Sequence, residues 1–236
     1  MYGIINKTNV QNVKITMIDK LLSLLAPHLC YMCRKSGTLL CDNCKYDIIQ
    51  EASDGCILCA VPTGRSGVCG DCRPPFSRAW YVGDRTDQLR RLIDDYKFNR
   101  VQAASEVLAA LLFERIGRLP EDCIIVPVPS SPAHVRQRGY EHIKLVADQL
   151  AKLNKCSMET LLTRRSYSVQ TGKTRKERED QARTAFGTRG ECRDKTILLV
   201  DDTVTTGATV KAAAEQLQKA GAADVWVAAV ARQPLD

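Results

Sequence analysis

The sequence has no apolar run that approaches the length of a membrane-spanning helix. The apolar stretch Leu21–Ala26 is much too short to cross a bilayer, and no segment with the pattern of a signal peptide precedes it. We therefore expect no transmembrane segment and a cytoplasmic location. A reducing cytoplasm also disfavours a scaffold of structural disulfides, which matters for the many cysteines of this chain.

Cysteine occurs eleven times in the 236 residues. Eight of these residues form four Cys-x-x-Cys pairs within one segment: Cys30/Cys33, Cys41/Cys44, Cys56/Cys59 and Cys69/Cys72. Each pair can place two thiolates on one tight turn, and two such turns make a tetrahedral metal site. The pattern predicts two zinc sites, while an iron or iron–sulfur site is the alternative that uses the same ligands.

The four pairs can be combined in two ways. In the sequential combination the first two pairs form one site and the last two form the other; an interleaved combination stays open. We favour the sequential one because the loops between its pairs are short. The other three cysteines have no partner at a suitable spacing and are expected to be small buried hydrophobes: Cys123, Cys156 and Cys192.

The most informative segment is 197–209, which reads Ile-Leu-Leu-Val-Asp-Asp-Thr-Val-Thr-Thr-Gly-Ala-Thr. Its apolar run predicts a strand that ends in Asp201 and Asp202, and a short loop leads into a helical pattern. This layout brings loop amides and a helix N-terminus to one point, which suits an anion such as phosphate. Gly207 allows the backbone to approach such a ligand closely.

The polar side chains of this segment extend the prediction from a phosphate to a sugar phosphate. Thr205, Thr206 and Thr209 supply hydroxyl donors, and the two carboxylates can accept hydrogen bonds from vicinal hydroxyls. Together they predict a site for a ribose 5-phosphate. A receiver domain also has a strand that ends in carboxylates, but only 34 residues follow Asp202, too few for the rest of that fold.

The hydrophobic pattern alternates between strands and helices. We expect helices at 87–97, 103–116, 139–153 and 207–220, and strands at 124–128, 197–200 and 225–230. This alternation predicts an α/β fold with a parallel sheet, whose ligands bind at the carboxyl ends of strands. The highly charged residues 164–183 are expected to form a loop or a mobile hairpin.

The positive charge is concentrated in one part of the chain. Residues 130–195 hold 15 Lys and Arg against 8 Asp and Glu, so their excess equals the net charge of +7 of the whole chain. Such an excess favours a polyanionic partner: a pyrophosphate, a nucleotide or a nucleic acid.

The segment at 197–209 resembles the motif of type I phosphoribosyltransferases that binds PRPP, 5-phosphoribosyl 1-diphosphate. Val126-Pro127-Val128-Pro129 and Arg138-Gly139-Tyr140-Glu141-His142 follow in the expected order behind the cysteine pairs, as do Gln170, Arg178 and Ala185-Phe186. Because these segments follow the cysteine pairs in this order, the chain resembles the ComF family from about Met17 to Arg232.

The resemblance implies a type I phosphoribosyltransferase-like parallel sheet flanked by helices, preceded by a small zinc-ribbon module with four cysteine ligands for each metal ion. It divides the chain into an N-terminal tail with a short helix (1–28), a double zinc ribbon (29–75) and the phosphoribosyltransferase-like domain (76–236). It makes Asp201 and Asp202 the ribose-binding carboxylates. The remaining contacts to PRPP and its Mg²⁺ would come from Thr203, Thr205, Thr206, Gly207, Ala208, Thr209, Pro127, Val128 and Arg138.

The chain departs from the family pattern at Glu141 and His142, where the family has Asn and Gln, and at Gln181, where it has Asn. These positions lie in segments expected near a second substrate or nucleic acid. The resemblance implies a competence protein that handles incoming single-stranded DNA, together with competence proteins at the inner face of the membrane. An active phosphoribosyltransferase and a PRPP-sensing regulator are the alternatives, and no clear hood for an acceptor base is visible in the sequence.

Overall fold

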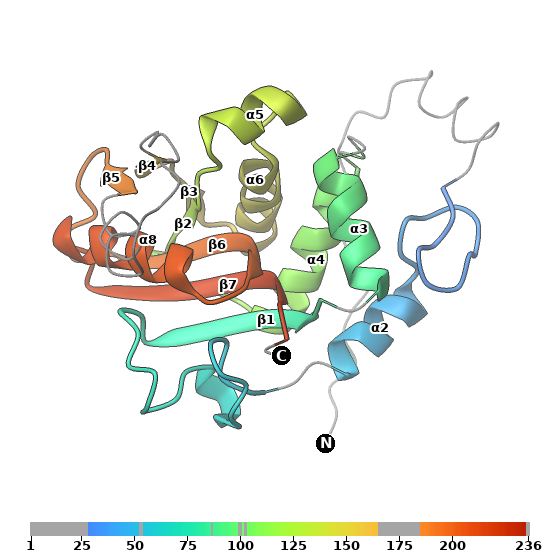
Figure 1. The fold of residues 1–236 in the computed structure, drawn as a ribbon, viewed down its shortest axis with the longest axis horizontal. Helices are drawn as coiled ribbons and strands as arrows, with labels where there is room; N and C mark the ends of the chain where they lie inside the picture. Colours follow the sequence, from blue (N-terminus) through green and yellow to red (C-terminus); the bar gives the residue numbers. More distant parts are fainter. Residues whose placement is uncertain are drawn as a thin grey trace, which may run out of the picture.

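The computed structural model describes residues 28–51, 54–85, 87–98, 101, 103–164 and 185–234. Nearly all of the expected N-terminal tail and all but one residue of the charged segment 164–183 lie outside these ranges. The described residues contain a parallel sheet of five strands in the order β1-β7-β6-β2-β3 and an antiparallel pair, β4-β5 (Figure 1).

The strands and the helices are numbered in chain order. The strands are β1 (Arg78–Asp84), β2 (Ile124–Pro127), β3 (Ser157–Met158), β4 (Leu162–Arg164), β5 (Phe186–Thr188), β6 (Thr196–Val204) and β7 (Asp224–Arg232). The helices are α2 (Asp42–Gln50), the 3-10 helix η1 (Gly64–Ser66), α3 (Asp87–Phe98), α4 (Ala104–Ile116), α5 (Pro132–Arg138), α6 (His142–Asn154) and α8 (Ala208–Lys219).

The predicted α/β fold with a parallel sheet is confirmed, but some predicted boundaries are wrong. The strand expected at 197–200 continues to Val204, because pairing with β7 extends beyond the apolar run. The helix expected at 139–153 is also wrong at its start: Gly139 has a φ of 84° and ends α5, and α6 begins at His142. Helix α2 and strand β1 were not predicted.

The strand β6 is the centre of the sheet, since β2 pairs along one side of it and β7 along the other. Its side chains alternate between two hydrophobic cores, as a strand requires. Leu198 and Val200 join the core beneath α3, α4 and α6, whereas Ile197 and Leu199 join the core beneath α8. We call these two sides of the sheet the α4 face and the α8 face.

The cysteine-rich segment divides between these two faces. Cys30 and Cys44 belong to the core of the α4 face, with α2 packed on α4 and β1. Cys56 and Ile57 belong to the core of the α8 face, beside Tyr81 of the edge strand β1. Figure 1 shows β1 at the edge of the sheet. The boundary between residues 75 and 76 stays a prediction, but both cysteine groups share a core with the sheet.

The second cysteine group also approaches the backbone of β1 closely. Gly67 has a φ of 65°, and a Cβ atom at this position would lie 1.9 Å from the carbonyl oxygen of Ala79. Only glycine fits here without a movement of the strand. No helix within the described residues is long and apolar enough to span a membrane.

The shared cores predict that the cysteine groups and the sheet unfold together. Leu40→Ala on the α4 face and Ile57→Ala on the α8 face should each lower the free energy of unfolding by about 2–5 kcal/mol, since both side chains are fully buried. Urea unfolding followed by the fluorescence of Trp80 and Trp226 measures this, because both tryptophans lie in the sheet.

Val61→Ala is the matched control for that measurement, because the Val61 side chain is 51% exposed and its truncation should change little. A tryptophan transition that Ile57→Ala leaves in place would show that the cysteine segment folds independently of the sheet.

Candidate functional site

A small pocket lies where β6 ends and α8 begins. It is lined by Asp201, Thr203, Val204, Thr205, Gly207, Thr209 and Val210. Gly207 is the N-cap of α8 with a φ of 75°, so the first amides of the helix open toward this pocket. The pocket gathers hydroxyl groups and the N-terminus of a helix, which is the chemistry that a phosphate group needs.

Two threonines of this loop have distinct roles. The hydroxyl of Thr206 accepts a hydrogen bond from the backbone amide of Ala208 (3.4 Å), the first residue of α8. The hydroxyl of Thr203 is buried and has no hydrogen-bond partner among the described residues. A buried hydroxyl without a partner is costly, so a ligand that bonds to it would be stabilised.

The second cysteine group packs against the threonine loop. A Cβ atom on Gly207 would lie 2.1 Å from Cδ2 of Leu58, a residue between Cys56 and Cys59. Leu58 is itself buried in the core of the α8 face. The cysteine turn and the phosphate-type loop are therefore in direct contact.

The two adjacent carboxylates face opposite sides of β6. Asp201 lines the pocket of the threonine loop, whereas Asp202 extends toward α3 and α6 on the α4 face. The two predicted ribose-binding carboxylates therefore do not line one pocket together, and their role stays a prediction. The alternation of a strand explains the difference, because β6 continues beyond both residues.

Burial and the neighbouring negative charge of Asp202 raise the pKa of Asp201 to about 8. The Asp201 carboxyl also accepts a hydrogen bond from the backbone amide of Asp202 (2.8 Å). Burial acts in the same direction at Asp202, but a hydrogen bond with His142 and the charge of Lys97 hold the pKa of that carboxyl well below its usual range. One carboxyl is thus protonated near neutral pH and the other is a fixed anion.

Asp202 is the centre of a buried polar cluster. Lys97 at the end of α3 lies 2.7 Å from Oδ1 of Asp202, and His142 Nε2 contacts Oδ2. Arg138, the last residue of α5, donates to Nδ1 of His142 at 2.9 Å. The same guanidinium nitrogen lies 3.4 Å from His142 Nε2, and the hydroxyl of Ser130 lies 3.2 Å from Nδ1. The cluster links four elements: α3, α5, α6 and β6.

The remaining predicted residues lie beside this cluster. Pro127 pairs with Val200 in the sheet, and the amide of Val128 donates to the carbonyl of Val200 at 2.9 Å. Pro127 and Val128 therefore lie at the carboxyl end of β2, next to the end of β6 that carries Asp201. Arg138 is only 9% exposed, and its Nε atom has no partner among the described residues.

Sequence reasoning missed Lys97 and Leu58, and it left the role of His142 open. Lys97 lies at the end of an amphipathic helix, where a cation is ordinary and carries no motif. Leu58 is one apolar residue between two cysteines. Of these three residues, only His142 could be noticed in the sequence, because the family pattern has glutamine at its position.

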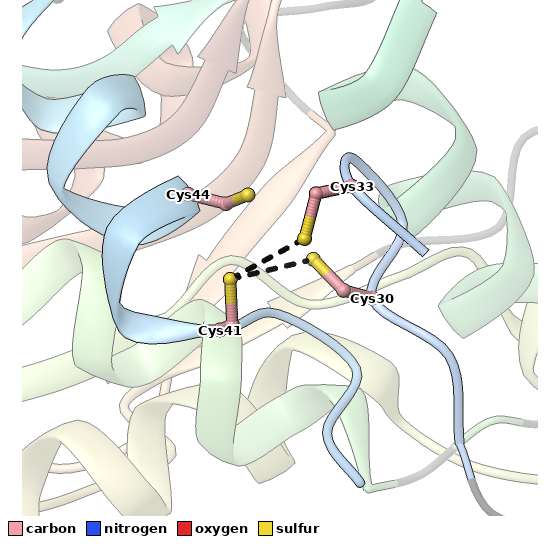
Figure 2. A group of neighbouring side chains, drawn as sticks. All are labelled: Cys30, Cys33, Cys41 and Cys44. Atoms are coloured by element: carbon pink, nitrogen blue, oxygen red, sulfur yellow. Dashed lines mark hydrogen bonds between the residues drawn. The ribbon is translucent and has the colours of Figure 1, made fainter. Parts of the chain in front are cut away.

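The eight paired cysteines form two groups of four in the sequential order, so the interleaved combination is wrong. The sulfur atoms of Cys30, Cys33, Cys41 and Cys44 all lie within 4.8 Å of one another, and the same holds for Cys56, Cys59, Cys69 and Cys72. Figure 2 shows the first group, in which the sulfur of Cys41 lies 3.9 Å from that of Cys30 and 3.6 Å from that of Cys33.

These distances fit a tetrahedral metal ion. With metal–sulfur bonds of about 2.3 Å, the sulfur atoms of a tetrahedral site lie about 3.8 Å apart. In the second group the sulfur atoms of Cys59 and Cys69 are 3.5 Å apart. Burial opposes ionisation of Cys30, but backbone hydrogen bonds from Cys41 and Cys33 lower its pKa to about 6, which favours the thiolate that a metal binds.

Comparison with known proteins agrees with this geometry. The family described as "Phosphoribosyl transferase domain" matches residues 135–235. The chain is 30% identical to the DNA utilization protein YhgH of Salmonella typhi over 86% of this chain and 96% of that protein. Competence protein F of Haemophilus influenzae is 28% identical over 70% of this chain and 78% of that protein, and competence protein ComFC of Streptococcus pneumoniae is 27% identical over 81% of this chain and 87% of that protein. The chain belongs to the ComF family.

A comparison with solved structures matches this ComF-family chain to the allosteric regulatory enzyme of purine biosynthesis. That match has a TM-score of 0.43 and 20% identity, over 58% of this chain and 30% of the other. The relatives and the family match over residues 135–235, together with the parallel sheet, confirm the family and the fold class expected from the sequence. The ligands of the site residues are not decided by these findings and stay proposals.

We predict that the purified ComF-family protein carries about two zinc ions, one in each cysteine group. Cys30→Ser and Cys59→Ser should each lower the zinc content by about one, because a tetrahedral site rarely survives the loss of one thiolate. Elemental analysis of reduced, folded protein measures this.

Cys156→Ser is the control, since Cys156 lies outside both groups and should leave the zinc content unchanged. Iron in place of zinc, or a folded reduced protein without metal, would contradict the prediction.

Proposed function

We propose that this ComF-family protein binds PRPP with Mg²⁺ at the end of β6 and handles incoming single-stranded DNA in the cytoplasm. The observation that carries the first part is the pocket of the threonine loop, where Gly207 opens the first amides of α8. The 5-phosphate would lie on Thr205–Thr209, and the Thr203 hydroxyl would gain a partner. Pro127, Val128 and Arg138 are proposed to lie on the pyrophosphate side.

In this proposal the two carboxylates act differently. Asp201 faces the pocket and accepts hydrogen bonds from the ribose hydroxyls. Asp202 is bonded to Lys97 and His142 and would hold the surrounding helices before it meets a ligand. A Mg²⁺ ion that arrives with the pyrophosphate would favour loss of the proton from Asp201.

The DNA part of the proposal is supported by the relatives and by charge. The relatives are named for DNA utilization and competence. The excess of positive charge at residues 130–195 begins directly after β2, beside the candidate site. Partner competence proteins and an association with the inner face of the membrane belong to the same proposal.

A phosphoribosyltransferase is the second candidate, favoured by the family match over residues 135–235. The two candidates differ in turnover. An enzyme would release pyrophosphate from PRPP when an acceptor base is present, whereas a binding protein or sensor would not.

We predict that Asp201→Asn weakens PRPP binding by about tenfold, because the amide loses an acceptor for the ribose hydroxyls. Calorimetric titration of the metal-loaded protein with PRPP, with and without Mg²⁺, measures this. Asp47→Asn on the exposed surface of α2 is the matched control. Equal affinity of wild type and Asp201→Asn would count against the site.

We predict that single-stranded DNA binding weakens steeply as salt rises. Replacing Lys173, Arg175 and Lys176 with Ala should lower the affinity and reduce the slope of its logarithm against log salt by about 0.7 for each phosphate that is no longer bound. These residues lie outside the described ranges, so this prediction rests on the sequence. Dissociation constants from fluorescence anisotropy over a salt series measure it.

The control for this experiment replaces Lys7, Lys14 and Lys20 with Ala, in a part of the chain without a comparable excess of charge. A salt-independent affinity of the wild type, or loss of binding only in the control, would refute the role of the basic segment.

A further inference from the structure

An exposed aromatic ring lies beside the polar cluster around Asp202. Phe98 is the last residue of α3, and 56% of its surface is exposed to solvent. The rest of this helix buries its apolar side chains, Leu89, Leu92, Ile93 and Tyr96, against the core of the α4 face. The packing of α3 therefore gives no reason for an aromatic residue at its end.

The ring of Phe98 is held in contact with a buried cation. The guanidinium carbon of Arg138 lies 5.2 Å from the centre of the ring, within the range of a cation–π interaction. Arg138 is fixed from its other side by its hydrogen bond to His142. The ring thus has a preorganised neighbour, while more than half of the residue's surface stays open to solvent.

Phe98 is connected to Asp202 in two ways, through its sequence neighbour Lys97 and through its contact with Arg138. Lys97, the neighbour of Phe98 in sequence, lies 2.7 Å from Asp202. Arg138 reaches the same carboxylate through His142. Asp201 follows on the other face of β6 and lines the pocket of the threonine loop. This series of contacts runs from the threonine-loop pocket through Asp201 and Asp202 at the end of β6 to Phe98, which matches the order of phosphate, ribose and base in a nucleotide.

We propose that Phe98, backed by Arg138, is a stacking platform for the nucleobase of a ribonucleoside 5′-monophosphate. The inference rests on the proposed phosphoribosyl site and adds the base to it. Aromatic rings stack on any nucleobase, so the platform favours a base without selecting one. If Asp201 accepts hydrogen bonds from both vicinal hydroxyls, it favours the ribonucleotide over the deoxyribonucleotide, which lacks one of the two.

The test compares ligands with and without a base on the full-length, metal-loaded protein. The probes are ribose 5-phosphate, the four ribonucleoside 5′-monophosphates, their deoxy forms and a single-stranded oligodeoxynucleotide, each titrated by calorimetry. We expect the wild type to bind ribonucleotides about tenfold more tightly than ribose 5-phosphate, because stacking adds to the contacts of the sugar phosphate.

The decisive variant is Phe98→Leu, which keeps an apolar side chain but removes the aromatic face. It should bind ribonucleotides as weakly as ribose 5-phosphate and leave ribose 5-phosphate binding unchanged, while Phe98→Tyr should retain the preference. Tyr46→Leu is the matched control, since Tyr46 is a 65% exposed aromatic residue on α2. Circular dichroism and thermal unfolding verify that each variant is folded.

Three results would overturn the proposal. The wild type could bind nucleotides no better than ribose 5-phosphate, or Phe98→Leu could keep the preference. Phe98→Leu could also weaken oligodeoxynucleotide binding alone, which would assign the ring to a base of DNA. Nucleotide binding that depends on Phe98 without any binding of ribose 5-phosphate or PRPP would support the platform while refuting the proposed phosphoribosyl site.

Discussion

The pairing of β6 with a parallel strand on each side is the constraint on which both the fold and the site depend. Fixed between β2 and β7, the strand must send successive side chains to opposite faces. Its apolar half thereby contributes to two cores, and its polar end supplies two different environments. Asp201 and Asp202 are neighbours in sequence, yet one meets the threonine loop and the other meets Lys97 and His142. A shift of register by one residue would exchange these roles.

The buried cluster around Asp202 shows how the cost of a buried charge is met. The carboxylate is bonded by a lysine and by an imidazole, and the imidazole is in contact with Arg138. Each polar group depends on the next, so removal of one partner would leave a buried charge uncompensated. The same interactions draw α3, α5 and α6 toward the end of β6. The groups that shape the site are therefore also the groups that join the helices to the sheet.

The sequence was sufficient for those parts of the molecule whose chemistry is local. Cys-x-x-Cys spacing predicted the two thiolate groups, and the strand, threonine loop and helix at 197–209 predicted the pocket. It was not sufficient where residues far apart in the chain meet. Lys97 and Asp202 are joined only by the packing of α3, and Leu58 reaches Gly207 only because the cysteine segment crosses β1. A role for Phe98 could not be predicted from the sequence, since a phenylalanine in an amphipathic helix is ordinarily part of a core. Only the structure shows that its ring is exposed and in contact with Arg138.

The position of β1 has a consequence for the synthesis of the protein. This strand precedes the other strands of the sheet in the chain, but its partner is β7, the strand nearest the C-terminus. During translation β1 and the cysteine groups packed beside it are synthesised before β7, so β1 cannot pair until the end of the chain has been made. Such distant pairing slows folding and leaves an unpaired strand edge exposed on the ribosome, where a chaperone or an early-bound metal ion would be most useful.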